Sequence, residues 1–123
     1  MEDQILKLET QYWQGMTNHE YDIVKKLTYF PCTVVSNNGV KSVDESTFKS
    51  LFDQGSDIKM QIKGLTDAVV KVFSQSFATI GYVVEIEMDI NGKSTLNKCA
   101  CTSAWIQENG FWRCQLHAET DLK

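Results

Sequence analysis

TSAWIQENGFWRCQLHAET, residues 102–120, is the stretch that decides the fold. Within it, Asn109-Gly110 separates two runs that each carry a tryptophan. Asn-Gly is typical of the two-residue turn that joins neighbouring antiparallel strands, and tryptophan is enriched in strands. The stretch therefore predicts a hairpin with one strand over about 94–107 and a second over 111–119.

The segment before this hairpin, residues 77–90, is the clearest strand of the chain. Its apolar side chains alternate, at Ile80, Tyr82, Val84, Ile86, Met88 and Ile90, and acidic side chains lie between them, at Glu85, Glu87 and Asp89. Alternation with a period of two predicts one buried face and one wet face. Asn91-Gly92 turns the chain into the next strand, so these strands predict an antiparallel meander, preceded by an extended segment at 65–73.

The first third of the chain has helical periodicity. Apolar residues recur every three or four positions, at Ile5, Leu8, Tyr12 and Met16. This spacing predicts a helix over 3–16. Asn18 is a candidate N-cap for a second helix over 19–28, and Pro31 ends that pattern.

Between these helices and the meander, the sequence predicts a short hairpin and a third helix. Thr33-Val34-Val35 is followed by a turn at Asn38-Gly39. Ser42 with Glu45 forms the pattern of a capping box, which predicts a helix over 43–54. Helices first and an antiparallel sheet afterwards predict an α+β fold, and residues 1–123 form a single domain in this interpretation.

Charge and hydropathy exclude several classes of protein. The net charge is −4 and Arg113 is the only arginine, so no nucleic-acid partner is expected. No stretch is long and apolar enough to span a membrane. The acidic start of the chain lacks the features of a secretory signal, which predicts a cytoplasmic protein with free thiols at its four cysteines.

The order of elements and the final hairpin resemble the nuclear transport factor 2-like superfamily, and in particular its SnoaL-like branch of small domains of unknown function. The residues that match the recurrent pattern T..W....G.WR...H are Thr102, Trp105, Asn109, Gly110, Trp112, Arg113 and His117. Residues 42–48 add a weaker match. The resemblance covers nearly the whole chain. It implies a strongly curved, mainly antiparallel sheet that wraps with the N-terminal helices into a cone, open at one end as a pocket, and a homodimer formed through the sheets.

The resemblance also allows a test against the ketosteroid isomerases of this superfamily. In those enzymes a carboxylate moves a proton, while a tyrosine and a protonated aspartate hold the enolate oxygen. Tyr12 resembles that tyrosine, because both lie eight residues before an acid that starts the second helix, here Glu20. The two carboxylate positions are occupied by Ser36 and Ser103. A serine without an adjacent base cannot take a proton at neutral pH, so a standard ketosteroid isomerase is not predicted.

The leading prediction is a domain that binds a small hydrophobic ligand in an aromatic-lined pocket. The chain carries 6 Phe, 4 Tyr and 3 Trp. Candidate ligand-binding residues are Tyr12, Trp13, Tyr29, Phe30, Phe48, Phe52 and Trp105, with Ser36 and Ser103 as polar groups that orient the ligand. No nucleotide-binding or metalloprotease motif occurs, and His19 and His117 are far apart in the chain. No cofactor and no metal site are therefore expected.

Two alternative functions are also open at this point. The first is an isomerase, dehydratase or cyclase that acts on a hydrophobic carbonyl ligand, with Glu85 or His117 as the base and Tyr12 as the hydrogen-bond donor. In that case Glu119, two residues from His117, could orient the imidazole. The second is a non-catalytic dimerisation or association module, whose working surface would be the strand face with Arg113, Gln115, His117 and Glu119.

Overall fold

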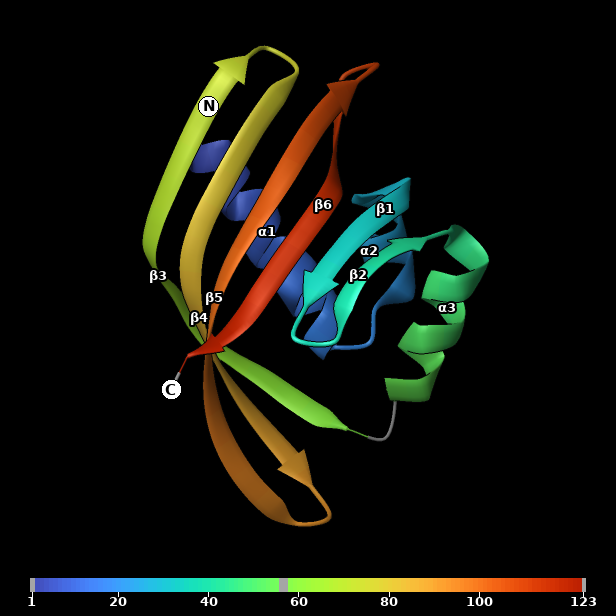
Figure 1. Ribbon diagram of the computed structural model, residues 1–123, viewed down its shortest axis with the longest axis vertical. Coiled ribbons are helices and arrows are strands. Elements are labelled where there is room, and N and C mark those ends of the chain that lie inside the picture. The colour runs from blue at the N-terminus through green and yellow to red at the C-terminus, as the bar shows by residue number, and fades with distance from the viewer. Residues whose placement is uncertain (1, 56–57, 123) are drawn as a thin grey trace.

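The computed structural model describes residues 2–55 and 58–122 of the chain, and within them one curved six-stranded sheet with helices at the N-terminal end of the sequence (Figure 1). The helices are α1 (Glu2–Thr17), α2 (Tyr21–Lys26) and α3 (Glu45–Gln54). The strands are β1 (Thr28–Ser36), β2 (Gly39–Val43), β3 (Lys59–Ser74), β4 (Phe77–Ile90), β5 (Lys93–Glu108) and β6 (Phe111–Leu122). Their order in the sheet is β2-β1-β6-β5-β4-β3, and only β1 and β6 run parallel. The predicted α+β fold is confirmed.

The two Asn-Gly turns build the meander of β4, β5 and β6. Asn91 and Gly92 have φ angles of 55° and 78°, and Asn109 and Gly110 have φ angles of 53° and 82°. Positive φ at both central residues is the geometry of a type I′ turn, which fits the twist of antiparallel strands. Both predicted hairpins are therefore confirmed.

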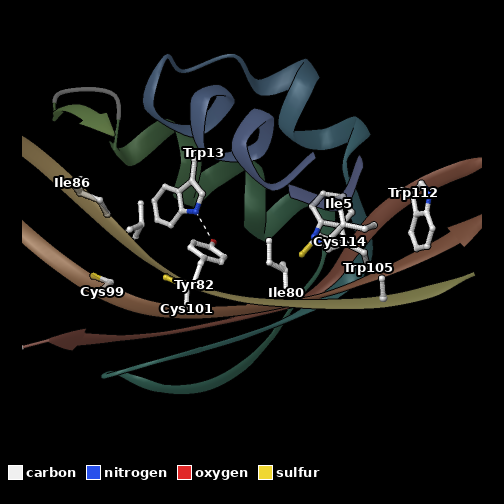
Figure 2. Close-up of a cluster of buried hydrophobic side chains, with 12 residues drawn as sticks. Ile5, Trp13, Ile80, Tyr82, Ile86, Cys99, Cys101, Trp105, Trp112 and Cys114 are labelled. Atoms are coloured by element: carbon white, nitrogen blue, oxygen red, sulfur yellow. Dashed lines mark hydrogen bonds between the residues drawn. The ribbon is translucent and has the colours of Figure 1, made fainter. Parts of the chain in front are cut away.

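Helix α1 covers one face of the sheet. Three residues at intervals of four, Ile5, Glu9 and Trp13, are buried along its inner side. Ile5 and Trp13 pack towards the alternating inward residues of β4, among them Ile80 and Tyr82 (Figure 2). The predicted buried face of β4 is thus the core face of the molecule. Among the described residues, no helix is long and apolar enough to cross a membrane.

The second helix is shorter than predicted, because the sheet takes over the chain at its C-terminal end. The Cys114 N–H donates to the Leu27 carbonyl at 2.7 Å, and β1 starts at Thr28. The predicted helix over 19–28 is therefore too long, and Pro31 lies inside a strand. Asn18 is not the N-cap: that position is Glu20, whose side chain makes no capping hydrogen bond.

The third helix and the strand after it also begin elsewhere than predicted. The N-cap of α3 is Asp44, whose carboxylate accepts from the Thr47 N–H at 2.8 Å, so the capping box at Ser42 and Glu45 is wrong. This hydrogen bond lowers the pKa of Asp44 below its ordinary value. Strand β3 begins at Lys59, six residues before the predicted extended segment.

A bulge in β6 changes which residues face the core. Trp105 pairs with Cys114 and Ala104 pairs with Leu116, so Gln115 is an extra residue in its strand. Cys114 pairs with the buried Trp105, and beyond the bulge His117 pairs with the buried Ser103. Both Cys114 and His117 therefore face the side of the sheet that α1 covers. The predicted common face of Arg113, Gln115, His117 and Glu119 is wrong, since simple alternation does not continue through the bulge.

Candidate functional site

A buried carboxylate, Glu9 of α1, lies at the centre of the largest polar network in the core. Only 1% of Glu9 is exposed. The Ser103 hydroxyl donates to its Oε2 at 2.8 Å and the Trp105 indole N–H donates to its Oε1 at 2.8 Å. The Tyr82 hydroxyl also donates to Oε2. All three partners are donors, and the two carboxylate oxygens of Glu9 accept all three hydrogen bonds.

Tyr82 connects Glu9 to a second residue of α1, Trp13. The Trp13 indole N–H donates to the Tyr82 oxygen at 2.7 Å, which leaves the Tyr82 proton for Glu9 (Figure 2). Burial, together with the adjacent Glu9 charge, raises the pKa of the Tyr82 phenol well above its ordinary value. Tyr82 therefore stays a neutral donor, and the hydrogen bonds run in one direction, from Trp13 to Glu9.

On the other side, the network reaches His117 through Ser103. The Ser103 oxygen lies 2.9 Å from His117 Nδ1. Because the single Ser103 proton goes to Glu9, Ser103 accepts from His117, which places a proton on Nδ1. The other ring nitrogen, Nε2, lies 3.4 Å from Glu119 Oε1, and Nδ1 lies 3.8 Å from Glu9 Oε2. His117 thus links the buried carboxylate to a more exposed one.

His117 and Glu119 open onto a cavity of about 270 Å³, which we call the inner pocket. It lies between α1 and the ends of β3, β4, β5 and β6. Its lining residues are Tyr12, Trp13, Met16, Met60, Ile86, Met88, Asn97, Cys99, His117, Glu119 and Asp121. Rings, thioethers and aliphatic side chains make up most of this set, and the acidic groups lie on β6.

A larger hollow of about 720 Å³, the outer groove, lies on another side of α1, against α2 and the turn between β5 and β6. It is lined by Gln4, Leu8, Gln11, Gln14, Gly15, Glu20, Ile23, Lys26, Leu27, Gly110, Phe111, Trp112 and Arg113. Its polar residues are mostly amides and bases. None of them takes part in the network around Glu9.

The structure brings some of the predicted ligand-binding residues together at the inner pocket. Tyr12 and Trp13 line it, whereas Ser103 and Trp105 are not in its lining and donate to Glu9. The Tyr12 hydroxyl lies 2.9 Å from Thr28 Oγ1. Since the Thr28 proton goes to a backbone carbonyl, the Tyr12 proton is used at Thr28. Burial raises the pKa of Tyr12 above its ordinary value.

Other predicted ligand-binding residues lie outside the inner pocket. Phe48 and Phe52 pack edge-on against Phe30 and Tyr21, with ring centroids 5.4 Å apart in the pairs Phe30–Phe48 and Tyr21–Phe52. This aromatic cluster holds α3 against α2 and β1. Tyr29 is likewise not part of the inner-pocket lining.

The remaining candidates also lie apart from the inner pocket. Ser36 lines a small hollow of about 160 Å³ at the β1–β2 turn, which it shares with Glu119 and Asp121. Glu85 lies on the face of β4 opposite to its buried neighbours, 3.9 Å from Lys98. The three candidate catalytic residues, Tyr12, Glu85 and His117, therefore do not converge on one point.

Sequence reasoning missed Glu9, although the chain carries a signal for it. Glu9 lies four residues after Ile5 and four before Trp13, on the apolar stripe that predicts the buried side of α1. A charged residue at such a core position needs partners, because an isolated buried charge is very costly. The pattern thus marks Glu9 as a residue that requires buried donors.

The four cysteines are free and buried. Burial, with Asp121 and Glu119 nearby, raises the pKa of Cys99 to about 11. Burial raises the pKa of Cys101 to about 12. These groups therefore stay thiols at neutral pH and act as small apolar side chains. In the described part of the chain, no group of three or more His, Cys, Asp or Glu residues could hold a metal ion.

Comparison with known proteins yields relatives in structure only. No protein-family model and no curated protein matches the chain. Its structure is similar to that of an NTF2-like protein from Cytophaga hutchinsonii, with a TM-score of 0.82, 16% identity and coverage of 98% of this chain and 97% of the other. A protein of the NTF2-like family from Streptomyces avermitilis, proposed to be a dehydratase, gives a TM-score of 0.85 at 15% identity over 98% and 95% of the two chains.

The CaMKII hub of S. rosetta is also similar, with a TM-score of 0.82 at 15% identity over 96% of this chain and 94% of the hub. Identities this low establish the fold and leave the function open. The predicted resemblance is confirmed at that level, and the SnoaL-like branch stays a prediction. The chain has the nuclear transport factor 2-like fold.

Proposed function

We propose that this chain binds a small apolar molecule in the inner pocket. The observation that carries the proposal is the link from the buried carboxylate of Glu9, through Ser103, to His117 at the pocket lining. Ligand sites are typically apolar cavities with a few well-placed polar groups. Here the polar group is held by a core network, so its position is fixed before a ligand arrives.

Burial of the Glu9 carboxylate also has a free-energy cost, and a role in core packing alone does not explain why that cost is accepted. Burying a charged side chain costs several kcal/mol even when it is well hydrogen-bonded, and an apolar replacement is often as stable. Glu9 could therefore be replaced by an apolar residue if its role were only to fill the core. Glu9 instead holds Ser103, and Ser103 holds His117, so the buried charge has a function at the pocket.

A pair of blocking substitutions tests this proposal. Met88 lines the inner pocket and Phe111 lines the outer groove. In a screen of apolar compounds with fewer than about fifteen heavy atoms, followed by tryptophan fluorescence, we expect hits that bind the wild type and Phe111→Trp but not Met88→Trp. Circular dichroism checks that both variants fold. Hits that are lost only in Phe111→Trp, or a library without any hit, would contradict the proposal.

A second copy of the chain is a further candidate partner, favoured by the composition of one sheet surface. The face turned away from α1 carries small residues at its centre, namely Gly81, Ala100, Ala104 and Ala118. We infer that two copies pack through this face, whose small side chains allow close approach. Sedimentation equilibrium tests this: Ala104→Arg should turn a dimer into a monomer, and a wild type that is monomeric at 100 µM, about a hundred times a typical micromolar dissociation constant, would contradict it.

A further inference from the structure

We propose that the ligand of the inner pocket is an apolar amine, bound as its ammonium ion. This inference rests on the proposed binding function and adds the chemical class of the ligand. It follows from three properties of the lining: the sign of its charges, the direction of its hydrogen bonds, and the position of the neighbouring lysines.

The charged groups at the inner pocket are predominantly negative. Glu119 and Asp121 line it directly, and Glu9 lies 3.8 Å behind the His117 ring. His117 is the single imidazole, and no lysine or arginine occurs in this lining, which the structure describes throughout. Carboxylates at the edge of an apolar cavity favour a cation, since a partly desolvated charge is attracted more strongly than one in water.

Three hydrogen-bond donors of the lining are already used within the protein. The Trp13 N–H goes to Tyr82, the Tyr12 hydroxyl to Thr28, and the Cys99 thiol to Asp121 Oδ1 at 3.4 Å. These protons cannot serve a carbonyl oxygen or a carboxylate without breaking a bond. A carbonyl ligand, the class expected from the resemblance, would therefore meet few free donors here, among them the amide of the exposed Asn97.

Among the carboxylates of the lining, Asp121 accepts from Asn37 and Cys99, whereas Glu119 makes no hydrogen bond within the described residues. His117 carries a proton on Nδ1, which Ser103 accepts, and its other ring nitrogen, Nε2, is directed towards Glu119. Glu119 Oε1 lies 3.4 Å from that nitrogen. An ammonium group in the pocket would donate to the carboxylate of Glu119, which carries the opposite charge.

Two lysines of the adjacent strands, Lys63 and Lys98, pair with carboxylates on the opposite face of the sheet. Lys63 pairs with Glu87 at 2.9 Å, and Lys98 lies 3.9 Å from Glu85. Glu85 and Glu87 alternate with the inward residues of β4, so these ion pairs hold the lysines away from the pocket. The acidic residues of β6 therefore keep their charge available for a ligand.

The shape of the pocket sets the rest of the ligand. About 270 Å³ accommodates one ring and a short alkyl chain. The rings of Tyr12 and Trp13 can contact a cation or an aromatic group, and the thioethers of Met16, Met60 and Met88 adapt to apolar shapes.

Three matched probes test the inference: 4-phenylbutylamine, 4-phenylbutanol and 4-phenylbutyrate, which share the apolar part and differ in the head group. In calorimetric titrations at pH 7.5 we expect the amine to bind about tenfold tighter than the alcohol, with still weaker binding of the butyrate. Equal or tighter binding of the alcohol or the butyrate would overturn the inference.

Two substitutions of Glu119 assign the preference to this residue. Glu119→Gln should reduce the ratio of amine to alcohol affinity to about twofold, and Glu119→Lys should make the butyrate the preferred probe. Glu20→Gln, in the outer groove, is the matched control and should leave the ratio unchanged. A ratio that is the same in all four proteins would overturn the inference.

The same data separate the inference from the function on which it rests. If the alcohol binds as well as the amine and both are lost in Met88→Trp, the pocket binds ligands and the amine class is wrong. If none of the three probes binds, the amine class is wrong, and the screen of apolar compounds decides separately whether the pocket binds a ligand.

Discussion

The inner pocket and the outer groove lie on two sides of the same helix and differ in what supports them. The outer groove is the larger hollow, at about 720 Å³ against about 270 Å³. Its polar residues, such as Lys26 and Arg113, project from the molecular surface. The inner pocket is bordered by His117, whose ring is fixed through Ser103 to the buried Glu9.

This difference in support, and not the size of the hollow, is the reason for proposing the inner pocket as the ligand site. A surface groove forms wherever two elements meet, and mobile side chains at its edge do not define a geometry for a ligand. A polar group that is anchored in the core defines such a geometry, because folding has already fixed its position before a ligand binds. The following predictions change one region at a time, from the largest expected effect to the smallest.

Removal of the buried carboxylate should have the largest effect. Glu9→Ala leaves Tyr82, Ser103 and Trp105 without their acceptor, at about 1–3 kcal/mol for each donor. We expect a loss of about 3–9 kcal/mol in the free energy of unfolding, measured by urea denaturation. Glu20→Ala, at the exposed edge of the outer groove, should cost less than about 0.5 kcal/mol. Similar losses in the two variants would contradict the central role of Glu9.

Interruption of the link between the core and the inner pocket should have the next largest effect. Ser103→Ala removes one donor from Glu9 and the acceptor of His117 Nδ1, which should cost about 1–3 kcal/mol. It should also weaken the binding of 4-phenylbutylamine, because the ring loses its fixed tautomer. Ser46→Ala, whose hydroxyl contacts only the exposed Asp44, is the control. Unchanged amine affinity in Ser103→Ala would show that the link has no role in binding.

Alkaline pH should destabilise the protein through Tyr82. Its pKa in the folded state lies above the ordinary value of about 10, so the unfolded state loses its proton first. The stabilisation is complete below pH about 10 and is lost as the pH rises towards the folded-state pKa, by about 1.4 kcal/mol at pH 11. Tyr82→Phe, less stable at pH 7, should lose about 1.4 kcal/mol less between pH 9 and pH 11. The same loss in both proteins would contradict this assignment.

The smallest effect should come from the contact between α1 and α2 beside the outer groove. A Cβ atom at Gly15 would lie 2.9 Å from Val24 Cγ2, which is too close without a shift of the helices. Gly15→Ala should therefore cost about 1 kcal/mol in the free energy of unfolding and leave amine binding unchanged. Gly55→Ala, where no atom lies within 4 Å of the added Cβ, should be neutral or slightly stabilising.

The sequence predicts the meander well because local signals specify it. The alternation of residues 77–90 and the two Asn-Gly turns need no knowledge of distant contacts, and all three appear in the structure. Helix α2 and the start of β1 were predicted less accurately, since their boundary depends on the hydrogen bond between Cys114 and Leu27. Local preference cannot predict a boundary that a strand 87 residues away imposes.

The candidate site could be predicted only in part, for two physical reasons. The bulge at Gln115 turns His117 inward, and no feature of residues 111–119 alone shows where a strand gains a residue. Glu9 stands on a predicted apolar stripe, so its burial could be expected, but its donors come from β4 and β5, about 70–95 residues later. Tyr12 and Trp13, by contrast, lie on the inner side of α1 as its periodicity predicts.

The three tryptophans allow the most direct test of the claim that the inner pocket is the binding site. The indole N–H of Trp13 reports the inner pocket, that of Trp105 reports Glu9, and that of Trp112 reports the outer groove. In ¹H–¹⁵N correlation spectra during a titration with 4-phenylbutylamine, we expect a saturable shift of the Trp13 signal, a smaller shift of Trp105, and no change at Trp112. A shift of the Trp112 signal with an unchanged Trp13 signal would place the ligand in the outer groove and contradict the claim.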